Sequence, residues 1–362
     1  MFGVNQDGLV GTSSLDSKKE LGMNTGVIPT NFRSEHLDHI AVWSASWKDS
    51  ANFLNDFLGW DIHPLQFSAS GESVGDMDLV FINANGVWIE LVQPTSKGPG
   101  MDLLEALGDG AVVELDFQCS NYQLSLDKAL EHNLQMIGMD GLPLKDRGKI
   151  IDGVIDPNAE GPPPEEYLAY YPFDLSGGTA VEIYERIDTD KESILNKRDK
   201  IFGLDRYNQP INQKKPKTRY LTILVDDIDK VCDFYKKHIL LNVSQSIDWE
   251  GHKLSVIDAK GVFEESISLR IIQPVADDSI MQIYKSKGSG HIMDIGVEVD
   301  NLNDFIENIQ SPHEKIKIVD YARTNQDLEN PFKKDDVMQE NYFYFPLELS
   351  HGMNLKVFEK NS

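Results

Sequence analysis

The chain has 362 residues, of which 40% are hydrophobic, so it is long enough for two or three domains with cores of their own. Its formal net charge is −25, and a surface this negative repels phosphate backbones and anionic lipid, which excludes nucleic acid and membrane surfaces as expected partners. No apolar stretch approaches the ~18 residues of a membrane-spanning helix, and the two cysteines, Cys119 and Cys232, lie far apart, which favours a reducing cytoplasm.

Residues 1–34 are predicted to form a flexible leader. They contain no cationic start followed by an apolar core, so they do not fit a secretion signal. The first predicted strand is "HIAVW", from His39 to Trp43, and Ser46 follows it as the cap of a helix with apolar residues at helical spacing. A further apolar strand, "IELVQP", spans Ile89 to Pro94.

A second strand-helix-strand unit comes next. The strand "ELDFQCSN" begins at Glu114, the helix "YQLSLDKALEHNLQ" begins at Tyr122, and the closing strands lie in "YYPFDLSGGTAVEIYER", Tyr170 to Arg186. Each unit has the order βαβββ, that is, one strand, one helix and three strands. Two such units are predicted to form one α+β domain over residues 35–190.

The C-terminal half of the chain repeats this plan. Four segments match in the same order, at offsets of 181, 180, 180 and 174 residues, which makes a chance resemblance improbable. We therefore predict a linker over residues 191–216 and a second domain over 217–362, each domain being a cup of eight strands. The matched segments begin at His39 and Tyr220, at Ile89 and Leu269, at Glu114 and Asp294, and at Tyr170 and Tyr344.

One histidine and several acids occupy corresponding places in the first half. His39 begins the first strand, Glu90 lies in the last strand of that unit, and Glu114 and Glu182 are their counterparts in the second unit. If the two units are related by a pseudo-twofold axis, these side chains meet in one cup. Clustered carboxylates repel one another, and a divalent cation relieves that repulsion, so the pattern predicts a metal site. Asp116 lies on the face of Glu114 and is a candidate acid or base.

The segments "LDHIAVW", "VWIELVQP" and "GGTAVEIYE" resemble the vicinal oxygen chelate superfamily, which includes glyoxalase I, methylmalonyl-CoA epimerase, extradiol dioxygenases and resistance proteins. The resemblance covers nearly all of the chain after residue 34 and implies tandem domains of paired βαβββ units around a metal. It places the metal ligands at His39, Glu90, Glu114 and Glu182. The family commonly has histidine where this chain has Glu114, so one histidine and three carboxylates remain.

This ligand set favours Mg²⁺, Mn²⁺, Ca²⁺ or Fe²⁺, with Zn²⁺ as a further option. The resemblance implies a lyase or isomerase that acts on a small oxygenated organic substrate through an enolate-like intermediate, with Glu182, Glu114 or Asp116 moving the proton. Two alternatives stay open: a ring-cleaving extradiol dioxygenase, and a non-catalytic protein that binds a small molecule. A second copy of the chain, as a homodimer, is a candidate partner.

The second half has different residues at the corresponding positions. They are Tyr220, Arg270, Asp294 and Lys356, and two cations among them exclude a divalent metal. Arg270 and Asp294 are candidates for a buried ion pair. We therefore expect a structural role for this half, with an anion pocket at Arg270 and Lys356 as the alternative.

Overall fold

The computed structural model describes most of the two predicted domains. The described residues are 36–63, 77–119, 122–137, 143, 166–186, 214–261, 266–310, 333–335 and 337–360. The predicted leader and most of the predicted linker lie outside them, so both stay predictions. No helix in these ranges is both long and apolar enough to cross a membrane.

The first half folds around one seven-stranded sheet with the order β2-β3-β4-β1-β5-β7-β6. Its first unit is a complete βαβββ unit, and the described part of its second unit contributes three strands, with β5 at the centre of the sheet beside β1. The elements are β1 (His36–Trp43), α2 (Trp47–Leu58), β2 (Asp61–His63), β3 (Met77–Asn83), β4 (Trp88–Pro94), α4 (Pro99–Leu107), β5 (Val112–Gln118), α5 (Tyr122–Glu131), β6 (Glu166–Tyr170) and β7 (Ala180–Arg186).

The second half folds around a nine-stranded sheet with the order β10-β11-β12-β8-β13-β16-β15-β14, in which β9 also pairs with β11. The expected eight strands become nine because two short strands, β9 and β10, both pair with β11. The elements are β8 (Lys217–Leu224), α7 (Ile228–Phe234), the π-helical turn η2 (Tyr235–Ile239), β9 (Asn242–Val243), β10 (Ile247–Trp249), β11 (His252–Lys260), β12 (Ser266–Gln273), α8 (Ser279–Lys287), β13 (His291–Glu298), α9 (Leu302–Gln310), β14 (Lys333–Asp335), β15 (Glu340–Tyr344) and β16 (Leu355–Lys360).

Strand pairing reproduces the internal repeat residue by residue. His39 on β1 lies opposite Asp116 on β5, and Tyr220 on β8 lies opposite Gly296 on β13, at offsets of 181 and 180. Even the bulges recur at matching sites, at Asp38 on β1 and at Arg219 on β8. The two sheets therefore place corresponding residues at equivalent points. The other matching pairs are Ala41–Glu114 with Thr222–Asp294, Asp116–Glu182 with Gly296–Lys356, and Tyr170–Glu182 with Tyr344–Lys356.

The first helix of each half begins and packs in the same way. The side chain of Ser46 accepts a hydrogen bond from the backbone N–H of Asp49, and Asp227 caps α7 by accepting from Lys230. Both helices bury a phenylalanine at the same position, Phe53 and Phe234. These caps and buried faces hold each helix against its sheet.

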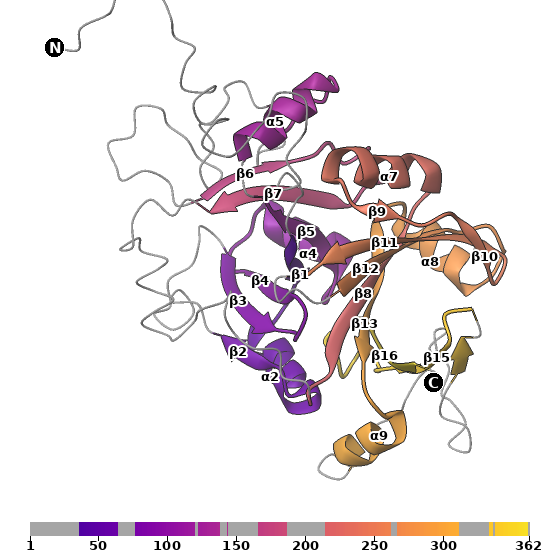
Figure 1. The fold of residues 1–362 in the computed structure, drawn as a ribbon. Helices are drawn as coiled ribbons and strands as arrows, with labels where there is room; N and C mark the ends of the chain where they lie inside the picture. The colour runs from indigo at the N-terminus through magenta and orange to yellow at the C-terminus, as the bar shows by residue number, and fades with distance from the viewer. Residues whose placement is uncertain are drawn as a thin grey trace, which may run out of the picture.

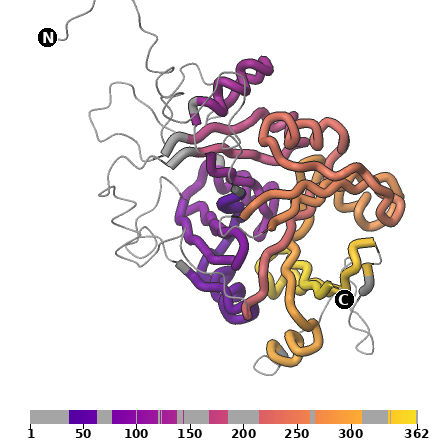
Figure 2. The backbone as a smooth tube through the Cα atoms, in the orientation of Figure 1, coloured from indigo at the N-terminus to yellow at the C-terminus, as the bar shows by residue number. Residues whose placement is uncertain are grey.

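The two halves lie side by side and share one hydrophobic core (Figures 1 and 2). Phe53 of α2 contacts Phe345 in the second half, with ring centroids 5.3 Å apart. The reciprocal pair, Phe234 of α7 and Tyr171 in the first half, lies 5.1 Å apart. Because each contact recurs with the halves exchanged, the halves are related by a pseudo-twofold axis.

Glycines permit close backbone contact across this interface. A Cβ added to Gly110 would lie 2.1 Å from the carbonyl carbon of Gly352, and one added to Gly290 would lie 2.2 Å from that of Gly178. Gly110 and Gly290 are equivalent in the repeat, and all four glycines have positive φ. The two halves therefore lie too close together at these glycines to leave room for a side chain.

Gly110→Ala is expected to reduce the free energy of unfolding by about 3 kcal/mol or more, because it adds a steric clash to the unfavourable positive φ. Gly59→Ala is the matched control, since Gly59 also has positive φ but has open space around its Cβ position. It is expected to lose only about 1–2 kcal/mol. Urea unfolding of both variants measures the difference, and equal losses would show that the close contact at Gly110 is unimportant.

Candidate metal centre

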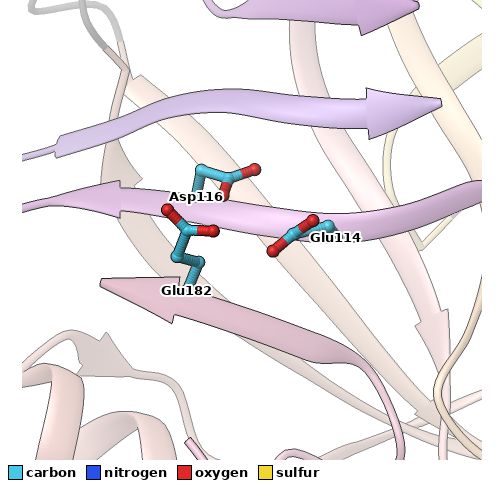
Figure 3. Close-up of side chains that lie close together, drawn as sticks. All are labelled: Glu114, Asp116 and Glu182. Carbon is cyan, nitrogen blue, oxygen red and sulfur yellow. The ribbon is translucent and has the colours of Figure 1, made fainter. Parts of the chain in front are cut away.

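Three carboxylates converge on the concave side of the first sheet. Glu114 and Asp116 are two residues apart on β5, so they point to the same face, and Glu182 on β7 is paired directly with Asp116. One oxygen from each of the three acids lies within 4.8 Å of the others. Figure 3 shows the three side chains close together, with Glu114 and Asp116 on one strand and Glu182 on the neighbouring strand. We call these three residues the acid cluster.

His39 and Glu90 extend the acid cluster toward the neighbouring strands. Nε2 of His39 on β1 lies 3.2 Å from Oδ2 of Asp116 and 3.7 Å from Oε2 of Glu90 on β4. The side chains of His39 and Glu90 are 14% and 15% exposed, against 2% for Asp116. His39 and Glu90 are therefore partly open to solvent, as Glu114 is, whereas Asp116 is enclosed.

A β-bulge adds a further acid next to the histidine. Strand alternation places Asp38 and His39 on opposite faces, but the bulge at Asp38 breaks the alternation. Oδ2 of Asp38, which is buried, lies 2.9 Å from Nδ1 of His39. When Nδ1 carries the proton and donates it to Asp38, Nε2 presents its lone pair to Asp116 and Glu90.

Aromatic side chains surround the acids. The ring of His39 is packed edge-on against Phe81, at 5.4 Å between centroids, and lies 6.0 Å from Tyr184. Tyr170 on β6 is buried, and its side chain hydrogen-bonds to Glu182 and Glu114, while burial and these two carboxylates raise its pKa well above 10. Its hydroxyl therefore stays protonated and donates to the acids.

Burial and mutual repulsion disfavour the charged form of the acid cluster. Burial, followed by the negative charges of Glu114 and Glu182, raises the pKa of Asp116 well above its usual range. Burial also raises the pKa of Glu114, although hydrogen bonds from Tyr170 and Glu182 oppose the shift. In the absence of a cation these carboxyl groups tend to hold protons at a pH where ordinary acids have lost them.

The residues present fit a divalent cation. Oε1 of Glu114 and Oδ2 of Asp116 are buried and accept no hydrogen bond among the described residues. Oxygens within 4.8 Å of one another lie about 2.8 Å or less from a common central point, so small side-chain rotations would bring all three to the ~2.0–2.6 Å of a bound ion. An ion would supply positive charge to both oxygens and a bonding partner to Oε1 of Glu114, while Oδ2 of Asp116 already lies 3.2 Å from Nε2 of His39.

The structure brings together all five residues that the sequence singled out: His39, Glu90, Glu114, Asp116 and Glu182. Their roles as ligands or catalytic groups stay predictions. Asp116, predicted as an acid or base beside the metal, lies at the centre of the acid cluster. Sequence reasoning missed Asp38 and Tyr170 as neighbours of the site. The repeat could have indicated Tyr170, because a tyrosine stands at the corresponding position in the second half, Tyr344. No such signal existed for Asp38, because regular strand alternation places its side chain on the face opposite to His39.

The second cup contains a different charge arrangement at the same positions. Arg270 and Lys356, which replace Glu90 and Glu182, both bind Glu340 of β15. Nη2 of Arg270 lies 2.5 Å from Oε1 of Glu340, and Nζ of Lys356 lies 3.2 Å from Oε2. Because β12 and β15 are separated in the sheet by β8, β13 and β16, this contact crosses the concave face of the cup.

The partner of Arg270 differs from the one proposed for it. Asp294 was the candidate acid, but the structure pairs Arg270 with Glu340. The two oxygens of Asp294 instead accept hydrogen bonds from Thr222, at 2.6 Å, and from Tyr344, at 2.9 Å. The hydroxyl groups of Thr222 and Tyr344 therefore satisfy the carboxylate of Asp294. The guanidinium of Arg270 pairs with the carboxylate of Glu340 instead.

The raised pKa of Asp116 predicts how the stability of the metal-free protein depends on pH. A carboxyl whose pKa is higher in the folded state stabilises the fold below its unfolded pKa of ~3.9, and this contribution is lost as pH rises through the folded pKa. Asp116→Asn removes the charge and is expected to raise the free energy of unfolding near pH 7, with a chelator present, by about 1–3 kcal/mol.

Urea unfolding at a series of pH values measures this effect. Asp56→Asn, at an exposed position on α2, is the control and is expected to change little. The prediction would be contradicted if the free energy of unfolding increased from about pH 5 to pH 8 in both the wild type and Asp116→Asn.

Known structures share this architecture. The chain is similar to a mutant of 4-hydroxymandelate synthase from Streptomyces coelicolor, with 10% identity over 91% of this chain and 93% of that chain, and a TM-score of 0.56. It is also similar to catechol 2,3-dioxygenase, with 10% identity over 90% of this chain and 88% of that one, and a TM-score of 0.50. No known protein family and no curated protein matches its sequence. The chain therefore has the tandem α+β fold of the vicinal oxygen chelate superfamily, as its sequence resemblance implied.

Proposed function

We propose that the first cup is a divalent metal centre and that the protein is an enzyme acting on a small oxygenated organic molecule. The observation that carries this proposal is the acid cluster: three carboxylates within 4.8 Å, two on buried residues and one on the half-buried Glu114, and two of the three have an oxygen that accepts no hydrogen bond among the described residues. Such an arrangement is costly unless a cation is bound. The shared fold supports the proposal, since the similar structures include a synthase and a dioxygenase by name.

Glu114, Asp116 and Glu182 would hold the ion, with His39 and Glu90 on the more exposed side. These mostly oxygen ligands suit Mg²⁺, Mn²⁺, Ca²⁺ or Fe²⁺. When bound, a divalent ion supplies Lewis acidity toward a substrate carbonyl or a pair of neighbouring oxygens. Asp38 holds His39 through Nδ1 and so fixes which nitrogen faces the ion.

The remaining chemistry assigned to this chain is proton transfer. Glu114 or Glu182 would remove a proton from carbon beside a carbonyl, because both carboxylates lie in the acid cluster. Asp116, at the centre of the cluster, would return it. The single hydroxyl hydrogen of Tyr170 is shared between Glu114 and Glu182 and helps to orient their oxygens. This division of roles is that of a lyase or isomerase.

An extradiol-type dioxygenase is the second candidate, and one observation favours it: catechol 2,3-dioxygenase shares the fold. Against it stands the ligand set, since the described residues contribute one histidine and otherwise carboxylates, whereas non-haem iron oxygenases use two histidines and one carboxylate. A non-catalytic small-molecule binder is the third candidate and predicts no turnover at all.

Metal binding tests the centre directly. Protein stripped by a chelator and titrated with Mn²⁺ in a calorimeter is expected to bind one ion per chain. Glu114→Gln and Glu182→Gln each keep the shape of the side chain but remove a charged ligand, so each is expected to weaken binding at least about tenfold.

Asp294→Asn is the matched control, because Asp294 occupies the position of Glu114 in the second cup. It is expected to bind Mn²⁺ as the wild type does. Two ions per chain, or unchanged affinity in both glutamate variants, would place the metal elsewhere and defeat the proposal.

The type of reaction is tested by proton exchange. In D₂O, the Mn²⁺-loaded protein is expected to exchange the hydrogens beside the carbonyl of small α-hydroxy ketones, such as hydroxyacetone, followed by ¹H NMR, and Asp116→Asn is expected to slow this exchange at least about tenfold. Exchange no faster than with metal alone, together with oxygen uptake by the Fe²⁺-loaded protein and catechol, would instead support the dioxygenase.

A further inference from the structure

The second cup encloses a cavity of about 180 Å³. Its charged lining includes Arg270 and Lys356, at the positions of Glu90 and Glu182 in the first cup. Part of the wall is apolar or aromatic, and the residues of this kind include Trp249, Leu254, Ile272, Met293, Met338 and Tyr342. The volume is below the ~300–1,000 Å³ of pockets for drug-sized ligands, so any ligand is small.

The charged groups on this cavity have more donors than the described residues use. Two guanidinium nitrogens of Arg270, Nη1 and Nη2, bind Glu340, and each of them carries a second N–H group. The ammonium of Lys356 has three N–H groups. It donates to Oε2 of Glu340 and lies 4.1 Å from the ring centroid of Tyr342. The cavity therefore offers hydrogen-bond donors to an oxygen acceptor.

The two cations beside the cavity are already matched by carboxylates. Two cations, Arg270 and Lys356, are matched by the carboxylates of Glu340 and Asp294, all within the same cup. Glu250 and Asp278, which also line the cavity, add negative charge. A ligand that carried its own negative charge would upset this balance and meet those two acids.

We propose that the second cup is a metal-free binding site for a small uncharged molecule that has a carbonyl oxygen and an apolar body. The carbonyl oxygen accepts hydrogen bonds from Lys356 and Arg270, and the apolar body packs against Trp249, Met293 and Met338. Thioether and indole groups suit such packing because they adapt to flat or irregular apolar surfaces. The site is separate from the proposed metal centre and does not depend on it.

Three probes of similar shape separate the contributions of shape, oxygen and charge: acetophenone has a carbonyl, ethylbenzene lacks the oxygen, and benzoate carries a negative charge. Titrations followed by ligand-observed NMR are expected to show saturable binding of acetophenone, with a Kd of about 1 mM or below. Ethylbenzene and benzoate are expected to bind at least about tenfold more weakly, because the first lacks the acceptor and the second adds an unbalanced charge.

Lys356→Met removes one donor but leaves the Arg270–Glu340 pair, and it is expected to weaken acetophenone binding at least about tenfold. Met338→Trp fills the cavity from a partly exposed turn and is expected to abolish binding, which keeps the test valid if Lys356→Met does not fold. Glu182→Gln is the matched control, because Glu182 occupies the position of Lys356 in the first cup, and its binding is expected to be unchanged.

The absence of saturable acetophenone binding would overturn the proposal and would mean that the cavity holds only water. Tighter binding of benzoate would overturn the assignment of an uncharged ligand. Loss of binding in Glu182→Gln, but not in Met338→Trp, would show that the probe binds in the first cup instead.

Discussion

The repulsion among buried carboxylates in the first cup is the constraint that dominates this protein. Glu114 and Asp116 on β5 and Glu182 on β7 lie on adjacent strands, and burial removes much of the water that would otherwise screen their charges. Strand pairing fixes their Cα positions, so only side-chain rotation can move the carboxylates apart. The fold therefore maintains a concentration of negative charge that either holds protons or holds a cation.

The second cup has the same backbone arrangement but carries different charges at the corresponding positions. At the positions of Glu90 and Glu182 it has Arg270 and Lys356, and Glu340 reaches across the cup to bind both. The bulge that carries Asp38 beside the first centre carries Arg219 in the second half, and Arg219 forms an ion pair with Glu298. Duplication thus kept the backbone, including its irregularities, while the charges of the two cups diverged. We propose a metal ion for the first cup, whereas the second cup is neutralised by its own side chains.

Much of this arrangement could be predicted from the sequence because it follows from periodicity. The constant offsets revealed the repeat, and the two-residue period of strands placed His39, Glu90, Glu114 and Glu182 on faces that meet. These arguments need only local structure and an approximate symmetry, and both hold in the strand registers.

The other features of the two cups could not be predicted from the sequence, because they depend on departures from regular structure and on contacts between distant strands. Asp38 reaches His39 only because a bulge breaks strand alternation, and no local sequence signal marks that bulge. The pairing of Arg270 with Asp294 was wrong because Glu340 belongs to a strand that is distant in the sheet and comes close only when the sheet curves into a cup. Curvature of this kind is a property of the whole sheet, which local patterns do not specify.

The most direct test of this account is a crystal structure of the protein soaked in Mn²⁺, with anomalous scattering used to locate the ion. The account predicts one anomalous peak in the first cup, within ~2.0–2.6 Å of oxygens from Glu114, Asp116 and Glu182, and none beside Arg270 and Lys356. A first cup without a peak in crystals that contain Mn²⁺ at saturating concentration would contradict it, because the buried carboxylates would then be stable without a cation.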